Sequence, residues 1–156
     1  PMAAEIERKF LVKNDLWRAS VISEAVIKQG YLCRQDNSTI RVRVAGDAAW
    51  INIKSATQGI RRLEYEYPIP LPDAEGLLAE VAEQPFIDKI RYQVRQGGHV
   101  WDLDVFRGLN QGLVLAEVEL GAEDEAFEMP AWAGREVSGD PRYYNANLVK
   151  LPYCDW

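Results

Sequence analysis

The sequence predicts an α+β fold that is mainly β: a closed, eight-stranded antiparallel β-barrel, or tunnel, with a charged lumen and flanking helices. Seven segments of the 156-residue chain alternate ionisable residues with apolar ones. Successive side chains of a strand point to opposite faces, so each segment has one charged and one apolar face. Most of the charges come in same-sign pairs, which repel unless a neighbouring strand or a ligand supplies the opposite charge. Closing the sheet into a barrel brings the charged faces together and removes exposed strand edges.

The charged segments follow a fixed order along the chain. The first one begins at Glu5 and places two carboxylates and an ammonium on one face. A further strand is expected to start at 29–32, where Tyr31 has the parity to face the lumen. In chain order, the residues expected on the charged faces are Glu5, Glu7 and Lys9; Arg41 and Arg43; Asn52 and Lys54; Glu64 and Glu66; Lys89 and Arg91; Asp102 and Asp104; Glu117 and Glu119.

Three helices are expected among these strands. Residues 14 to about 27 have apolar residues at helical spacing behind an Asn-Asp cap. Residues 73 to about 84 carry an apolar stripe and have a proline at each end. Asp140 and Pro141 form an N-cap followed by proline at the first helical position, which opens a segment through residue 147. We expect these helices to flank the barrel.

Glycine-containing turns are expected to join strands at 46–47, 97–98 and 108–112. The acidic segment 121–134 is interpreted as a longer connection or a lid. A mass of 17.7 kDa is typical of one domain, so residues 1–156 are predicted to form a single tunnel domain. Pro1, which precedes Met2, is expected to be a leftover of cloning.

The overall charge argues against nucleic acid as a partner. Eighteen basic residues stand against 24 acidic ones, and the basic residues lie in strand positions rather than in a run. The chain has no apolar run long enough for a signal peptide or a membrane span. Cys33 and Cys154 are interpreted as reduced thiols of a cytoplasmic protein, with a single bridge between them left open. A homodimer is also left open.

Other catalytic arrangements are missing from the sequence. His99 is the one histidine, stands beside a glycine turn and is interpreted as facing solvent. No Ser-His-Asp or Cys-His arrangement, zinc motif or GxxxxGK phosphate loop is present. Arg side chains suit phosphate oxygens, and carboxylate pairs suit Mg²⁺ or Mn²⁺, which accept oxygen ligands. The charged lumen therefore predicts a metal–phosphate site.

The charged pattern resembles a known family. Glu5-Ile6-Glu7-Arg8-Lys9 is similar to the ExExK signature of the CYTH superfamily, the triphosphate tunnel metalloenzymes. ExExK alone is a weak pattern, but here RxR, a Lys strand, ExE, KxR, DxD and ExE follow it in that order. The resemblance extends from Glu5 to about Lys150. It implies an eight-stranded tunnel that binds a triphosphate and uses a divalent metal to cleave or cyclise it.

Pattern and resemblance together assign the candidate site. The cations expected to contact phosphoryl oxygens are Lys9, Arg41, Arg43, Lys54, Lys89 and Arg91, and the resemblance adds Lys150 as a lid contact. The carboxylates expected to hold Mg²⁺ or Mn²⁺ are Glu5, Glu7, Glu117 and Glu119, joined by Glu64, Glu66 and Asp104.

Four assignments have alternatives. Glu64 and Glu66 could instead balance the arginines at 41 and 43, and one member of the 102–104 pair could belong to a plain hairpin. Lys54 or Lys89 is expected to serve as the general base. Tyr31 is expected to place its hydroxyl in the lumen, where it would help to select which phosphoanhydride is cleaved, or else to be a wall aromatic.

The predicted function is metal-dependent hydrolysis of a triphosphate, foremost of inorganic tripolyphosphate to pyrophosphate and phosphate. An adenylate cyclase of the class IV type and a thiamine triphosphatase are alternatives from the same superfamily. A binding module that holds polyphosphate without cleaving it is the alternative from another class. The absence of a recognisable base pocket favours the inorganic substrate.

Overall fold

The computed structural model describes residues 3–156, so the predicted leftover Pro1 lies outside the described residues. The strands are β1 (Ala3–Val12), β2 (Val21–Gln35), β3 (Ser38–Ala45), β4 (Ala48–Ser55), β5 (Arg61–Pro68), β6 (Ile87–Gln96), β7 (His99–Phe106), β8 (Val114–Glu119) and β9 (Ala133–Glu136). The helices are α1 (Leu71–Glu80) and α2 (Asn145–Lys150), with short 3-10 turns at Leu16–Ser20, Gly108–Asn110, Pro141–Tyr143 and Tyr153–Asp155.

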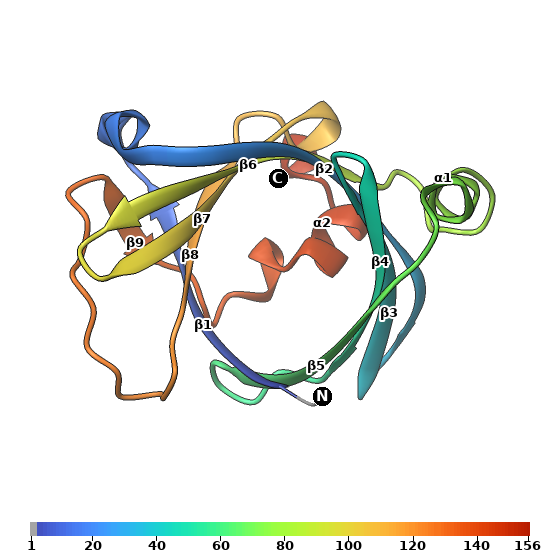
Figure 1. Cartoon of the computed structure of the whole chain (residues 1–156), viewed down its shortest axis with the longest axis horizontal. Coiled ribbons are helices and arrows are strands. Elements are labelled where there is room, and N and C mark those ends of the chain that lie inside the picture. The colour runs from blue at the N-terminus through green and yellow to red at the C-terminus, as the bar shows by residue number, and fades with distance from the viewer. Residues whose placement is uncertain (1–2) are drawn as a thin grey trace.

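The strands form one antiparallel sheet in the order β5-β4-β3-β2-β6-β7-β8-β1-β9, and β1 pairs with β5 as well. This extra pairing closes eight of the strands into the ring that Figure 1 shows end-on, with β9 added outside it. The predicted eight-stranded antiparallel barrel is confirmed, and β9 is the strand that the sequence pattern missed.

Strand β1 closes the barrel because its two halves pair with different neighbours. Residues 3–6 pair with β5, placing Glu5 opposite Arg62. Residues 7–11 pair with β8, placing Glu7 opposite Glu119 and Lys9 opposite Glu117. Residues directly opposite in an antiparallel pair share a face. The ExExK segment is therefore surrounded by charged residues from strands distant in sequence.

The helix predicted over residues 14–27 is wrong. Only Leu16–Ser20 is helical, as a 3-10 turn, and Val21 already begins the 15-residue strand β2. This strand pairs with β3 on one side and β6 on the other, so ladder hydrogen bonds and β-branched residues outweigh the helical spacing. Ile22 and Val26 are four residues apart, a spacing that places side chains on one face in a strand as well as in a helix. Both lie on the outer wall, where they are 50% and 42% exposed.

The other two helices form near their predicted places, but only α1 flanks the barrel. It packs against the outer wall through Ala74 and Leu78, which form a buried cluster with Val42 of β3. The C-terminal segment begins as a 3-10 turn at Pro141 and continues as α2 to Lys150. Figure 1 shows α2 within the ring of strands rather than beside it.

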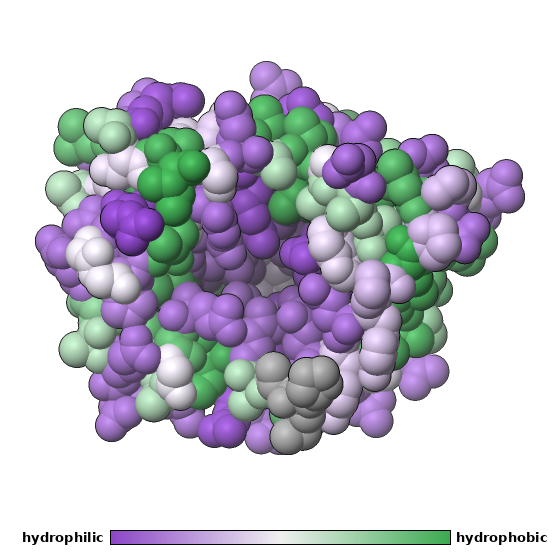
Figure 2. Space-filling view, viewed as in Figure 1, coloured by the Kyte–Doolittle hydropathy of each residue, from purple (hydrophilic) through white to green (hydrophobic). Residues whose placement is uncertain are grey.

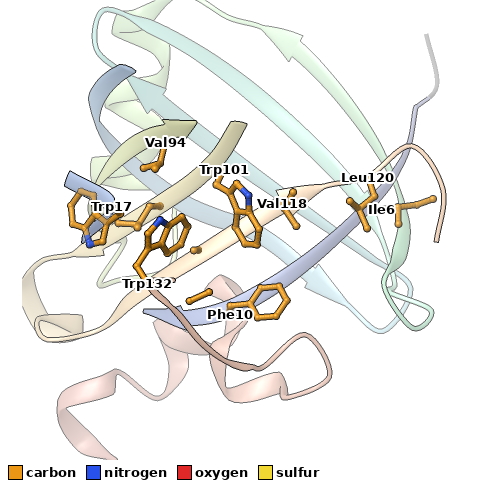
Figure 3. Packing of buried hydrophobic residues seen from close by; sticks show 11 residues of the cluster. Ile6, Phe10, Trp17, Val94, Trp101, Val118, Leu120 and Trp132 are labelled. Carbon is orange, nitrogen blue, oxygen red and sulfur yellow. The ribbon is translucent and has the colours of Figure 1, made fainter. Parts of the chain in front are cut away.

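The predicted turns at 46–47 and 97–98 join β3 to β4 and β6 to β7, and Gly46 and Gly97 both have positive φ. The segment after β8 is a long connection whose end becomes β9. Its Phe127 packs against the largest hydrophobic cluster, on the outer faces of β1, β7 and β8. Figure 3 shows this cluster, which includes Phe10, Trp101, Val118 and Trp132.

A second cluster closes one end of the lumen. The inward faces of β7 and β8 become apolar there, at Phe106 and Leu115, and Tyr31 joins them from β2. Leu148 and Val149 of α2 are buried in the same cluster, at 0% and 3% exposure. Burial of these two side chains draws α2 into the barrel end, so the charged lumen has a helix as its end wall.

Candidate functional site

The lumen encloses a cavity of about 840 Å³, visible in Figure 2 as a hollow with hydrophilic walls. Side chains from the strands, from the loops at 55–60 and from α2 line it. The basic residues on its wall are Lys9, Arg34, Arg41, Arg43, Lys54, Arg62, Arg91 and Lys150, and the acidic ones are Glu5, Glu7, Asp36, Glu64, Glu66, Asp102, Glu117 and Glu119. The wall thus carries both charges in equal number, which is suited to an anion that arrives with a cation.

Ion pairs between neighbouring strands hold most of the predicted residues in place. Lys54 Nζ lies 2.8 Å from Glu64 Oε2 and 3.6 Å from Glu5 Oε2. Lys9 Nζ lies 3.6 Å from Glu117 Oε1. Lys54 is directly opposite Glu64, and Lys9 is directly opposite Glu117, so strand alternation is converted directly into these contacts. The Lys54–Glu5 pair instead spans β5, which lies between β4 and β1.

Arg41 is positioned by an uncharged neighbour. Its Nε donates to Asn52 Oδ1 at 3.3 Å, and Asn52 Nδ2 donates to Glu66 Oε2 at 2.6 Å. Arg43 Nη2 lies 3.3 Å from the same Glu66 oxygen. Glu66 therefore positions Arg43 directly and Arg41 through Asn52, which agrees with the alternative that it balances the charges of the two arginines. Its side chain also lines the cavity.

Several carboxylates of the wall lie close enough to one another to raise each other's pKa. Glu119 has no basic partner within 4 Å among residues 3–156. Burial and the charges of Glu5, Glu64 and Asp102 raise its pKa. Burial, together with Glu117 and Glu5, also raises the pKa of Glu7 to about 8. These carboxylates repel one another, and a divalent cation would relieve the repulsion.

This donor set fits Mg²⁺ or Mn²⁺ in chemistry, since it consists of carboxylate oxygens. Within residues 3–156, however, no three acidic, histidine or cysteine side chains are gathered closely enough to form a preassembled metal site. The predicted ligands other than Asp104 therefore line one cavity without meeting at a single point, and their role stays a prediction.

Lys89 and Asp104 lie behind the cavity wall rather than on it. Both are 1% exposed, and Lys89 Nζ is 2.8 Å from Asp104 Oδ2. Arg91 donates to both oxygens of Asp104 at 2.8 and 2.9 Å. The carboxylate of Asp104 is thus occupied by two cations, whereas Asp102 is the member of that pair that lines the cavity. The prediction that Asp104 and Lys89 face the cavity is therefore wrong.

The remaining predicted residues reach the cavity. Tyr31 lines it while packing in the apolar end cluster, so it is an aromatic of the wall, and the role of its hydroxyl stays a prediction. Lys150 lines it from the last turn of α2. His99 lies outside it and pairs with Glu125 of the long connection. No helix within residues 3–156 has the length and hydrophobicity needed to cross a bilayer.

Sequence reasoning missed two cationic residues of the wall. Arg62 lies 3.3 Å from Glu5 Oε2 and 3.6 Å from Glu7 Oε1. It has the same parity as Glu64 and Glu66, so extending the alternation by one step would have found it. Arg34 had no such signal, because a register shift between Tyr31 and Cys33 interrupts the alternation of β2.

Comparison with known proteins agrees with this architecture. The family model described as CYTH domain matches residues 3–144. An inorganic triphosphatase of Acetivibrio thermocellus is 45% identical over 152 residues, which are 97% of each protein. One of Nitrosomonas europaea is 37% identical over 149 residues, covering 93% of this chain and 96% of that protein. A crystal structure of an inorganic triphosphatase matches with a TM-score of 0.69 at 36% identity, covering 93% of both chains. With its closed barrel and its ordered charged strands, the chain belongs to the CYTH domain family.

Proposed function

We propose that this protein is a metal-dependent hydrolase that converts inorganic tripolyphosphate to pyrophosphate and phosphate. The observation that carries the proposal is the enclosed lumen, whose wall combines phosphate-binding cations with metal-binding carboxylates. Two relatives that match nearly the full chain are named inorganic triphosphatase, and their similarity supports the same activity here. The free, exposed thiols of Cys33 and Cys154 are compatible with a cytoplasmic location.

The cations of the wall bind and orient the substrate in this proposal. Arg41 and Arg43 are spaced about 6.6 Å along β3, so they contact different phosphoryl groups of one chain. Lys9 and Arg91 approach from other strands, and Lys150 from α2. Lys89 acts from behind the wall, where it and Asp104 fix Arg91. Positioning and charge stabilisation are the main contributions that a protein makes to phosphoryl transfer.

Carboxylates that alternate with these cations on the wall would hold the metal: Glu5, Glu7, Glu64, Glu117 and Glu119, with Asp102 in place of Asp104. Bound there with the substrate, Mg²⁺ or Mn²⁺ would supply Lewis-acid stabilisation of the developing phosphate charge. Glu66 is better suited to organising the arginines, since it already accepts from Asn52 and pairs with Arg43.

Lys54 is the better of the two candidate general bases because it lines the cavity, whereas Lys89 does not. Burial and the charges of Arg41 and Arg62 lower the pKa of Lys54 to about 8. A base must be neutral to accept a proton, and the neutral fraction of Lys54 grows as the pH rises through its pKa. We expect kcat/KM to rise about tenfold per pH unit below about 8 and then to level off.

Lys54→Arg tests this assignment, since an arginine stays protonated across the same range. It should lower kcat by about 100-fold and remove the pH-dependent limb. The profile is measured at two saturating Mg²⁺ concentrations. A limb that shifts with Mg²⁺ reports deprotonation of the metal ligands instead, and an unchanged profile in the variant would assign the base elsewhere.

Phosphate release from tripolyphosphate, pyrophosphate, ATP and thiamine triphosphate, with and without Mg²⁺, tests the proposed function. We expect metal-dependent release from tripolyphosphate to exceed that from the organic substrates. ATP as the preferred substrate with cyclic AMP as product would make the protein a cyclase. Tight binding of tripolyphosphate without turnover would make it a binding module.

A further inference from the structure

Arg34 connects three parts of the molecule at the end of the cavity. Arg34 is the second-to-last residue of β2, and its side chain lines the cavity wall. Nη1 donates to the backbone oxygen of Ala146 in α2 at 2.6 Å, and Nη2 donates to Glu83 Oε1 at 2.7 Å. Glu83 follows α1, and its own backbone N–H donates to the oxygen of Tyr31 at 2.9 Å. The end of β2, the segment after α1 and α2 therefore meet at one guanidinium.

The helix that Arg34 holds is short and has few other polar anchors. Lys9 Nζ donates to the Tyr143 oxygen at 3.3 Å, and Lys89 Nζ lies 3.4 Å from Asn145 Oδ1. Both are longer contacts than those of Arg34, and Lys9 also belongs to the proposed phosphate grip. A phosphate that binds Lys9 competes with the Tyr143 oxygen. The contacts of Arg34 and Lys89 with α2 both stay available when substrate is bound, and the contact of Arg34 is the shorter one.

Glu83 makes Arg34 poorly suited to binding phosphate itself. The carboxylate accepts from the guanidinium and balances its charge, and the Ala146 oxygen occupies a second nitrogen. Lys9 also has a carboxylate partner, but that partner is Glu117, a proposed metal ligand, so metal binding would free Lys9 for phosphate. Glu83 is not a proposed metal ligand, so Arg34 stays paired. The position of α2 matters to the substrate, in contrast, because Asn145, Asn147 and Lys150 form the end wall of the cavity.

Building on the proposed function, we propose that Arg34 and Glu83 are a positioning pair. They fix α2 across the end of the lumen, keep Lys150 within reach of the terminal phosphoryl group and limit the length of the phosphate chain that fits. Loss of the pair lets α2 move outward. Binding of tripolyphosphate then weakens, and discrimination against tetrapolyphosphate falls. The reaction at the proposed metal ligands continues.

Arg34→Ala, Glu83→Gln and the double variant test the pair. We expect each single variant to raise KM for tripolyphosphate by about fivefold to tenfold with kcat changed by less than about twofold. The double variant should be no worse than Arg34→Ala, because both changes remove one interaction. The ratio of kcat/KM for tetrapolyphosphate to that for tripolyphosphate should rise in all three.

Asp88→Asn is the matched control, since it breaks the Arg107–Asp88 pair, 2.6 Å long and outside the cavity. It should leave KM and the substrate ratio unchanged. A raised KM in Arg34→Ala alone would overturn the proposal, because it would make Arg34 a direct phosphate ligand. Unchanged KM in every variant would overturn it too. Should Arg34→Ala fail to fold, Glu83→Gln carries the test.

Hydrogen exchange of the backbone amides at 145–150 supplies a readout that does not depend on activity. These amides should exchange about fivefold to tenfold faster in Arg34→Ala and Glu83→Gln than in the parent, with no change in Asp88→Asn. If the parent fails to cleave tripolyphosphate, the proposed function fails while this measurement still reports on the pair. Unchanged exchange would overturn the positioning role alone.

Discussion

Replacing Glu119 by Gln will lower metal-dependent phosphate release by about 100-fold or more, which is about 2.7 kcal/mol in activation barrier. Glu119 lines the cavity and has no basic partner within 4 Å among the described residues. Burial and the charges of the Glu5, Glu64 and Asp102 carboxylates raise its pKa. The amide keeps the shape of the side chain and removes the charge, so the barrel should stay folded.

The measurement combines kcat at saturating Mg²⁺ with Mn²⁺ binding followed by electron paramagnetic resonance. Both should be impaired in Glu119→Gln, and Glu5→Gln should behave in the same way. Glu80→Gln, at the exposed end of α1, is the control for loss of one negative charge. Normal Mg²⁺-dependent turnover in Glu119→Gln would show that the metal assignment is wrong.

Replacing Arg41 by Ala will raise KM for tripolyphosphate by about tenfold to 100-fold, while kcat changes much less. Arg41 is 7% exposed, and its guanidinium is oriented by Asn52 on the neighbouring strand. Charge-assisted hydrogen bonds to a bound phosphate contribute about 1.5–3 kcal/mol, which corresponds to this range. The contacts exist before and during the reaction, so their loss appears mainly in KM.

Arg61→Ala is the control for this variant. Arg61 is an exposed cation of the same sheet that does not line the cavity, next in sequence to Arg62, which does. Steady-state kinetics and calorimetric titration with tripolyphosphate should separate the two variants. Equal tripolyphosphate affinity in Arg41→Ala and the parent would contradict the proposed phosphate grip.

The charged faces of the barrel could be predicted from sequence because alternation is a local property of strands. Glu5, Glu7 and Lys9 share a face in any extended backbone, and so do Glu117 and Glu119. Their like charges require an oppositely charged neighbour, which the structure supplies as Arg62 opposite Glu5 and Lys9 opposite Glu117. The pattern thus predicted both the strands and the need for closure.

Long-range pairing decided the element that was predicted wrongly. Residues 21–27 have apolar side chains at a spacing that suits a helix, yet they form a strand with partners on both sides. A helix would have left the facing edges of β3 and β6 without hydrogen-bond partners. That cost depends on strands more than ten residues away in sequence, which local periodicity does not report.

Within an uninterrupted strand the sequence by itself determined which side chains face the lumen, because the period of a strand assigns faces wherever its partners lie. Only the tertiary structure decided which of them reach the cavity. Lys89 and Asp104 have the parity of wall residues but lie beneath Arg91, at the end where α2 enters the barrel. Burial of Leu148 and Val149 places that helix, and Arg34 holds it. Packing between distant segments sets depth along the lumen, and strand alternation carries no information about depth.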